Sequence, residues 1–241
     1  MPTAAAIIIG NEILSGKFAD ENGPFLIERL RALGVDLGRI VTIADDHDVI
    51  ADEVRRASSS FDHVFTSGGV GPTHDDITLE SVGAAFGEPM IAHPSLVKLL
   101  EAAGLSDEHS MRMATVPQST ELLWEGNAGF PVVLVHNVFV LPGVPKLFRL
   151  KFEAVADRFA GVQMLTRRIY TAQRETEIAA ILSAAQDAFE TVDIGSYPRF
   201  GTEPWRVIVT LESRHEADLQ SCYLRLCDEL DIMDRQTGAN E

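Results

Sequence analysis

A continuous apolar run, Ala4 to Ile9, opens the chain and ends at Gly10. A strand with one face in water alternates apolar and polar residues, whereas a run that is apolar at every position predicts a strand buried on both faces. Buried strands of this kind are typical of a parallel sheet that is covered on each side by other elements. The opening run therefore favours an α/β fold.

The segments that follow alternate between strand and helix patterns. Apolar residues three or four positions apart predict helices, and Asp48 is a candidate N-cap for the second helix. This alternation is the signature of a doubly wound, mostly parallel sheet. The expected elements are strands at 4–9, Val35–Ile43 and His63–Ser67, and helices with apolar faces at Phe25, Leu26, Leu30 and Leu33, at Ile50, Val54 and Ala57, and at Leu79, Val82 and Phe86.

The middle of the chain is less regular, and a second unit begins near residue 163. A β-α-β-β-α order in this last part suits a small α+β domain with helices on one face of its sheet. We therefore predict two domains, 1–162 and 163–241, with a frayed tail after Asp234. The expected helices are Pro94–Ala103, Leu147–Phe159, Glu175–Phe189 and Glu216–Leu230, and the expected strands are Glu121–Trp124, Val132–Val135, Val138–Leu141, Arg168–Ala172, Val192–Tyr197 and Arg206–Glu212.

Charge and composition exclude some classes of function. The chain has 241 residues and a formal net charge of −16, which argues against nucleic acid as a partner, because phosphate contacts need clustered Lys and Arg. The charge also argues against an anionic membrane as a partner. The two cysteines, Cys222 and Cys227, match no common zinc pattern and no disulfide framework. No apolar run suits a signal peptide or a membrane span, so we expect a cytoplasmic protein.

The loop after the third strand is the most informative segment. Gly68, Gly69 and Gly71 lie within four residues, directly after a strand and shortly before a helix. Glycines let backbone N–H groups approach a ligand without a Cβ in the way, and a helix N-terminus favours an anion. In open α/β sheets, ligands bind in the crevice at the carboxyl ends of the strands. The loop is therefore a candidate phosphate site, although a tight turn explains the glycines equally well when they are taken alone.

Carboxylates surround this loop. Asp75 and Asp76 follow the glycines, and Thr78 is a candidate cap for the next helix. Carboxylates beside a phosphate would repel it unless a divalent cation bridges them, which indicates Mg²⁺, Mn²⁺ or Co²⁺. A plain N-cap remains the alternative for either aspartate. Asp45 and Asp46, which end the second strand, should reach the same sheet edge or form a solvated loop, and the polar rim is completed by Glu12, Asp20 and Asn22.

These residues resemble the hallmark of a known family. Ser67-Gly-Gly-Val-Gly-Pro-Thr-His-Asp-Asp-Ile-Thr78 resembles the glycine loop of the molybdopterin-binding (MoaB/Mog-like) domain family. Within the family, the chain is similar to the N-terminal domains of competence/damage-inducible CinA proteins and of eukaryotic FAD synthases. Three further matches are Gly10-Asn-Glu-Ile-Leu-Ser-Gly16 with Asp20-Glu-Asn22, Val138-Phe-Val-Leu-Pro-Gly-Val-Pro145, and Gly195-Ser-Tyr-Pro198 in the small domain that follows in CinA proteins and is sometimes described as KH-like.

The resemblance implies roles for individual residues. Asp45 and Asp76 match the two aspartates that work at the pterin-phosphate site of molybdopterin adenylyltransferases. Asp75 and Asp76 are the expected metal ligands. Gly126-Asn-Ala-Gly-Phe-Pro131 departs from the Gly-Thr-Ala-Pro-Gly-like loop of many CinA domains. The expected ligand-binding residues are Gly10, Glu12, Asp20, Asn22, Ser67, Gly68, Gly69, Gly71, Thr73, His74, Pro142 and Gly143.

Two hypotheses about function follow. The first is a metal-dependent hydrolase of a nucleotide pyrophosphate of the ADP-ribose or FAD type, because the resemblance implies such activities. Asp75 or Asp76 would then hold the metal ion, and Asp45 would orient or deprotonate water. The alternative is a non-catalytic protein that binds molybdopterin or the phosphate of a nucleotide. In both, the expected partners are a small phosphorylated ligand and further copies of the chain in a homo-oligomer.

Overall fold

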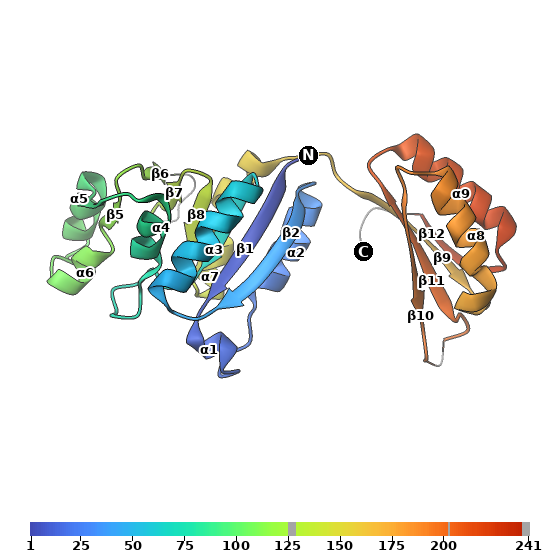
Figure 1. Ribbon diagram of the computed structural model, residues 1–241, viewed down its shortest axis with the longest axis horizontal. Coiled ribbons are helices and arrows are strands. Elements are labelled where there is room, and N and C mark those ends of the chain that lie inside the picture. Colours follow the sequence, from blue (N-terminus) through green and yellow to red (C-terminus); the bar gives the residue numbers. More distant parts are fainter. Residues whose placement is uncertain (125–128, 202, 238–241) are drawn as a thin grey trace. The chain divides into compact units, whose positions relative to one another are not determined.

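The computed structural model describes residues 1–124, 129–201 and 203–237. The chain divides into two compact units, Met1–Gly161 and Val162–Glu241 (Figure 1). The first half of the departure at Gly126–Pro131 lies outside the described residues, because the description stops at residue 124 and resumes at 129.

Unit 1 is built on a six-stranded sheet in the order β2-β1-β3-β8-β7-β6. The first four strands in this order pair in parallel, and the last two pairings are antiparallel. The architecture is the mostly parallel α/β sheet that the strand and helix patterns predict. The strands are β1 (Thr3–Ile9), β2 (Asp36–Ile43), β3 (His63–Ser67), β6 (Glu121–Leu123), β7 (Val132–Val135) and β8 (Val138–Leu141).

Strand β1 is buried on both faces, as its continuous apolar run predicts. Ala4 and Ala6 face one core cluster, and Ile7 and Ile9 face the other. The small alanines leave room on their face for a group of aromatic rings, in which the centroids of Phe65 and Phe159 are 5.0 Å apart. Because the central strands are packed on both faces, their ends and the loops that follow them are held in fixed positions.

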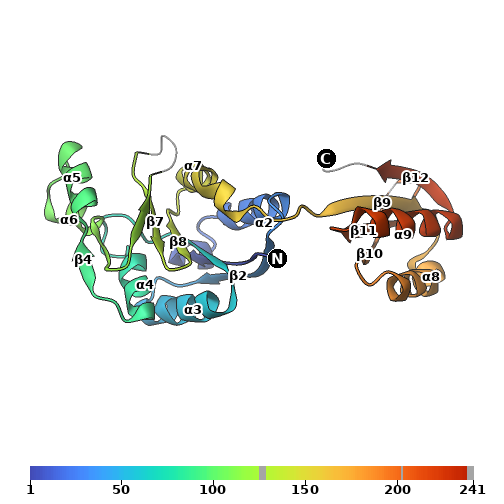
Figure 2. The same cartoon turned by 90° about the horizontal axis from the view of Figure 1, so that it is seen from above.

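Two pairs of helices cover the sheet. Figure 2 shows α2 (Asn22–Ala32) and α7 (Pro145–Val155) along one face, and α3 (His47–Ser60) and α4 (Thr78–Phe86) along the other. Two capping predictions are wrong. Asp46, not Asp48, caps α3, accepting from the Asp48 and Val49 amides at 3.0 and 3.1 Å. Thr78 caps nothing, because its hydroxyl is turned back to the Gly68 carbonyl at 2.8 Å.

Several short elements are not predicted from the sequence. In unit 1 they are α1 (Asn11–Leu14), β4 (Met90–Ala92), β5 (Thr115–Pro117) and α6 (Glu108–Arg112). Each has five residues or fewer, which is too few for a periodic pattern to show. The helix α5 (Pro94–Ala102) was expected, and the helix predicted at Leu147–Phe159 begins at Pro145 and becomes a 3₁₀ turn over Ala156–Phe159.

Unit 2 is a four-stranded antiparallel sheet in the order β10-β11-β9-β12. One core cluster packs the apolar residues of its helices against those of the sheet. The expectation of a frayed tail after Asp234 is wrong, because the backbone continues in strand β12 and pairs with β9 as far as Thr237. The elements are β9 (Leu165–Thr171), α8 (Glu175–Ala188), β10 (Asp193–Pro198), β11 (Val207–Ser213), α9 (Glu216–Glu229) and β12 (Ile232–Thr237). Across the described residues of both units, we find no helix with the length and apolarity to cross a bilayer.

Candidate functional site

Three loops of unit 1 meet at one buried side chain. Asn22, at the start of α2, is only 4% exposed. Its Nδ2 donates to Ser67 Oγ and to the Gly143 carbonyl oxygen, each at 2.8 Å. Its Oδ1 is buried and has no partner among the described residues. The asparagine therefore joins the loops that follow β1, β3 and β8, which parallel pairing brings to the same sheet edge.

Two glycines of the loop after β3 adopt positive φ angles. These angles are 110° at Gly68 and 65° at Gly69, in the region that favours glycine. A Cβ on Gly68 would lie 2.2 Å from the Ile9 carbonyl oxygen, and one on Gly69 would lie 2.3 Å from Thr78 Oγ1. The loop is thus packed closely against β1 and the start of α4. Within the described chain, the backbone N–H groups of Gly69, Val70 and Gly71 donate to no protein acceptor, so these donors are free for a ligand.

Two other glycines make room for carboxylates. A Cβ on Gly71 would lie 2.7 Å from Asp76 Oδ2, and one on Gly10 would lie 2.7 Å from both oxygens of Glu12. Each glycine thus lets an acidic side chain fold back over its own loop. Gly10 and Gly71 therefore act through the position of a neighbouring carboxylate.

Asp76 is held by its own loop. Its Oδ2 accepts from the Thr73 amide at 2.8 Å and lies 2.5 Å from the Thr73 hydroxyl. The same hydroxyl lies 2.6 Å from Asp75 Oδ1, and this hydrogen bond is the main reason that the Asp75 pKa is below its ordinary value. From α6, Arg112 donates to the carbonyl oxygens of Thr73 at 2.7 Å and Asp76 at 3.4 Å. The arginine thereby fixes the backbone that carries the two aspartates.

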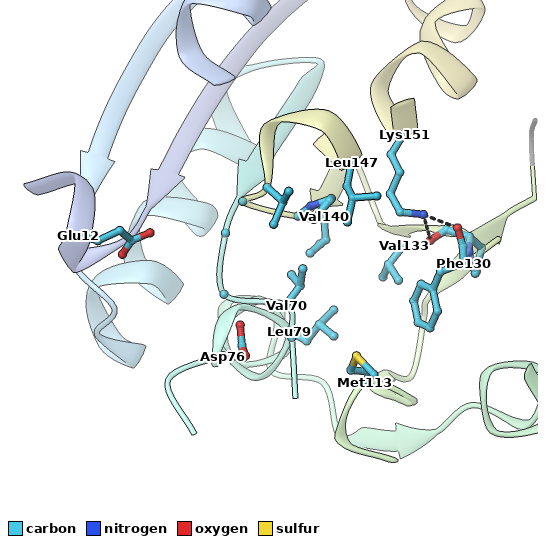
Figure 3. Close-up of a pocket in the computed structure, with 17 residues that line it drawn as sticks. Glu12, Val70, Asp76, Leu79, Met113, Phe130, Val133, Val140, Leu147 and Lys151 are labelled. Atoms are coloured by element: carbon cyan, nitrogen blue, oxygen red, sulfur yellow. Dashed lines mark hydrogen bonds between the residues drawn. The ribbon is translucent and has the colours of Figure 1, made fainter. Parts of the chain in front are cut away.

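A cavity of about 510 Å³ opens beside the glycine loop. This volume is in the range of small-molecule sites. Glu12 and Asp76 lie at one end of it in Figure 3, and Gly68, Gly69 and Gly71 also line it. The remaining wall is mainly apolar, and its residues are Val70, Leu79, Met113, Phe130, Pro131, Val133, Val140, Pro142, Gly143, Val144 and Leu147, together with Lys151.

Lys151 is the single cation among the described residues that line this cavity. It comes from α7 and is only 8% exposed. Its Nζ donates to the carbonyl oxygen of Phe130, lies 3.5 Å from that of Pro131, and is 5.7 Å from the centroid of the Phe130 ring. Burial lowers the pKa of this lysine below its ordinary value. In Figure 3 it stands at the opposite end of the cavity from Glu12 and Asp76.

A second, smaller cavity adjoins the first. Its volume is about 270 Å³, and it shares Glu12, Gly143 and Val144 with the larger one. Asp20 and Asn22 line it. Asp20 Oδ1 also accepts from the amides of Asn22 and Gly23 at 2.9 and 3.1 Å, and so caps the start of α2.

Most of the predicted site residues thus line one cavity or the other, and five do not: Gly10, Asp45, Thr73, His74 and Asp75. Asp45 lines neither cavity and instead accepts from the Asn11 amide at 2.7 Å, at the start of α1. Asp75 and His74 also lie outside both walls, and the His74 side chain is 98% exposed. Of the two adjacent aspartates, the structure therefore turns Asp76 toward the cavity and leaves Asp75 outside it.

Sequence reasoning missed Lys151, Arg112 and the apolar wall. For Lys151 a signal existed, because its spacing from Phe148, Phe152 and Val155 places it on the buried face of α7. A lysine on an apolar helix face needs an explanation. Arg112 gave no such signal, since α6 is short and lies far from the loop in sequence. Two other lysines, Lys17 and Lys146, line neither cavity.

The donors present define what kind of metal could bind. Among the described residues, no group of three or more His, Cys, Asp or Glu side chains is arranged to hold a metal ion. Carboxylates at Asp76 and Glu12 are hard oxygen donors, and Mg²⁺ commonly binds one or two such groups together with substrate phosphates and water. The residues therefore fit a metal ion that arrives with a phosphate ligand, and not a preformed cage.

Comparison with known proteins identifies the class. Residues 5–161 match the family model described as a probable molybdopterin binding domain. The chain belongs to this family, as the glycine loop and the sheet indicate. Residues 163–235 match a second model, the middle domain of FAD synthase, so unit 2 also has known relatives.

Individual relatives agree with this assignment. A protein of Archaeoglobus fulgidus is 33% identical over 81% of this chain and 85% of its own length. A probable FAD synthase of Caenorhabditis elegans is 34% identical over 91% of this chain, but only 48% of the relative is covered, so the chain spans about half of that protein. The crystal structure of CinA from Thermoplasma acidophilum is 28% identical with a TM-score of 0.61, over 66% of this chain and 99% of the other.

Proposed function

We propose that the chain is a metal-dependent hydrolase that cleaves the pyrophosphate bond of a dinucleotide-like substrate, of the ADP-ribose or FAD type. The observation that carries this proposal is the meeting of free glycine-loop amides with the Asp76 and Glu12 carboxylates in one cavity. The family and the names of the FAD synthase relatives support a nucleotide ligand.

The glycine loop would bind the phosphates. The amides of Gly69, Val70 and Gly71 donate to no acceptor in the described chain and would donate to the phosphate oxygens. Thr78 and Arg112 keep this geometry rigid through their bonds to the loop carbonyls. A rigid loop has its donors already aimed at the phosphate oxygens, so little reorganisation accompanies binding.

The carboxylates of Asp76 and Glu12 would have different roles in the reaction. Asp76 would hold the metal ion, which when bound supplies Lewis-acid polarisation of a phosphoryl oxygen. Glu12 would accept a proton from the attacking water, because it lines the cavity beside the loop. Asp45 would act indirectly, because its bond to the Asn11 amide fixes the start of the helix that carries Glu12. The reaction consumes one water and yields AMP with ribose 5-phosphate from ADP-ribose, or with FMN from FAD.

Turnover tests this proposal. The full chain is incubated with ADP-ribose and with FAD, in Mg²⁺, Mn²⁺ or Co²⁺, and AMP is measured by chromatography. We expect AMP with at least one metal, and its loss with EDTA. Binding of either nucleotide without AMP in any metal would contradict catalysis.

The second candidate is a binding protein for molybdopterin or a nucleotide phosphate. It is favoured by one observation, the lack of a three-ligand metal cluster among the described residues. Because the same loop amides would bind the phosphate, turnover is what separates the two candidates.

A further inference from the structure

The sheet of unit 2 has helices on one face only. Figure 1 shows α8 and α9 together on that face, and their apolar side chains form one core cluster with alternate residues of the strands. Successive side chains of a strand point to opposite sides, so the intervening residues belong to a second face, which we call the helix-free face. They are Asp193, Gly195 and Tyr197 of β10, Ile208, Thr210 and Glu212 of β11, and Thr166, Arg168 and Tyr170 of β9.

The middle of the helix-free face is aromatic. The Tyr197 ring lies over Gly195, where a Cβ would be 2.9 Å from a ring carbon, and this tyrosine is 54% exposed. On β9, the ring of Tyr170 meets that of Trp205 edge-on, with centroids 5.1 Å apart. Tyr and Trp, together with Arg, dominate the energetics of protein interfaces, and the net charge of −16 disfavours a nucleic-acid strand. The composition of this face therefore favours a protein partner.

Each end of this face carries a pair of like charges. At one end Asp193 lies directly opposite Glu212 in the register of β10 and β11, and we call these two the acidic pair. At the other end the Arg199 amide donates to the Arg206 carbonyl oxygen at 2.7 Å, and these two form the basic pair. Like charges opposite each other destabilise a sheet. Among the residues that the structure describes, Asp193, Arg199 and Arg206 form no side-chain hydrogen bond or ion pair, so neither pair is neutralised within the described chain.

The two charged pairs are equally far from the centre of the face. Ser196 lies three residues from Asp193 and three from Arg199, and its register partner on β11 is likewise three residues from each charged position of that segment. A two-fold axis that crosses the strands at this centre places the basic pair of one copy over the acidic pair of another. Arg168 and Tyr170 flank the same centre on β9, so the axis also brings Arg168 of one copy to the Tyr170 ring of the other, a cation–π arrangement.

We propose that two copies of the chain associate through the helix-free face, with the basic pair of each copy over the acidic pair of the other. This contact supplies the counter-charges that both pairs lack and buries the aromatic middle. The opposite orientation brings like charges together and is disfavoured, so the charges also fix how the copies face each other.

The size of the face sets the expected strength of the dimer. Its four strands have six or seven residues each, which gives a surface of roughly 15 Å by 20 Å. Two such surfaces bury an area near the lower limit of specific interfaces. We therefore expect a dissociation constant in the micromolar range.

Charge reversal at one position of each pair tests this arrangement. Sedimentation velocity on the full chain measures the dissociation constant of the unmodified protein, of Arg199→Glu and of Asp193→Arg. Arg225→Glu is the matched control, because it makes the same charge change on α9, which packs on the other face of the sheet. Thermal unfolding followed by circular dichroism shows that each variant is folded.

We expect each variant of the charged pairs to weaken the dimer by about tenfold or more, because like charges then meet across the two-fold axis. Arg225→Glu should leave it unchanged. An equimolar mixture of Arg199→Glu and Asp193→Arg should dimerise at least as tightly as the unmodified chain, since every reversed charge then faces an opposite one. An unmodified chain that is monomeric at about 0.2 mM, well above a micromolar constant, would overturn the proposal. So would a dimer that neither variant weakens, an equal loss in Arg225→Glu, or a mixture no tighter than either variant alone.

Discussion

The side-chain amide of Asn22 donates to the carbonyl oxygen of Gly143, at 2.8 Å and across 121 positions of sequence. The bond joins the loop after β1 to the loop after β8, and the same amide nitrogen also reaches Ser67 at the end of β3. A single buried group thus holds together the three segments that line both cavities.

This relationship predicts that Asn22→Asp damages the site more than its small change in shape suggests. A carboxylate in place of the amide would face the Gly143 carbonyl with no hydrogen to donate. Leaving buried groups unpaired costs about 1–3 kcal/mol each. We expect chemical denaturation to show a loss of at least about 1 kcal/mol, together with weaker nucleotide binding. An unchanged stability and affinity would show that the three loops are held by other contacts.

Asp76 and Asp75 make a matched pair for mutation. Because Asp76 lines the cavity and Asp75 does not, Asp76→Asn should lower kcat/KM by about 100-fold, the loss of a few kcal/mol of charge stabilisation. Asp75→Asn should lower it far less. Asparagine keeps an oxygen to accept from Thr73, so the cost in stability is about 1 kcal/mol. Equal kinetic losses in the two variants, or losses that merely follow unfolding, would argue against a role specific to Asp76.

Chelation should weaken binding of a pyrophosphate ligand. The net charge is −16, and a carboxylate and a phosphate oxygen about 4 Å apart repel by about 1 kcal/mol in water and by more in a shielded cleft. Lys151 cannot offset this repulsion, since it stands at the far end of the cavity. Calorimetry with a methylene-bridged ADP-ribose analogue should show affinity that falls with EDTA and returns with metal. Equal affinity with and without chelator would exclude the metal bridge.

The ion pair between α2 and α7 predicts a pH dependence of stability. Arg29 contacts both oxygens of Glu153, at 2.6 and 2.7 Å, and this bond lowers the Glu153 pKa. A lowered carboxyl pKa stabilises the fold above the unfolded-state value, and this gain is lost as the pH falls through the folded-state value. The side chains are 32% and 43% exposed, so the pair contributes about 0.5–1 kcal/mol.

The variant Glu153→Gln tests the direction of this pH dependence of stability. At pH 7 it should unfold at lower denaturant than the unmodified chain, and the gap should close below about pH 4, near and under the ordinary glutamate value. As a control, the same substitution is made in unit 2 at Glu229, which forms an exposed ion pair with Arg225. A gap that stays constant with pH would assign the effect of Glu153 to packing.

The sequence predicts the long elements of this fold well, for a physical reason. Strand β1 and helices such as α3 and α4 carry an apolar pattern long enough to be read. Caps and short elements depend on a few hydrogen bonds instead. Asp46 and Asp48 are equally suitable as caps by type, and only the direction of the chain after β2 decides between them. We further expect residues 1–160 to fold as an independent unit, and this stays a prediction.

The candidate site also has features that the sequence predicts and features that it does not. The glycine loop and its aspartates are contiguous in sequence, so their proximity was predictable. Lys151 and Phe130 reach the cavity from different elements, and their contact depends on how α7 packs beside the segment before β7. Asp45 behaves differently, because it follows a strand at the same end of the sheet but its carboxylate accepts from the Asn11 amide. The position of a residue at the end of a strand predicts which loops lie together, but it does not predict which side chains point into the cavity.

The central claim is that a metal ion is shared between Asp76 and a phosphate at the glycine loop. The most direct measurement is anomalous diffraction from crystals grown with Mn²⁺ and the methylene-bridged ADP-ribose analogue. The account predicts an anomalous peak within about 2.5 Å of an Asp76 carboxylate oxygen and a phosphate oxygen bonded to the amides of the 69–71 segment. A nucleotide bound in the cavity with no manganese at Asp76, or with its phosphates away from the glycine loop, would contradict it.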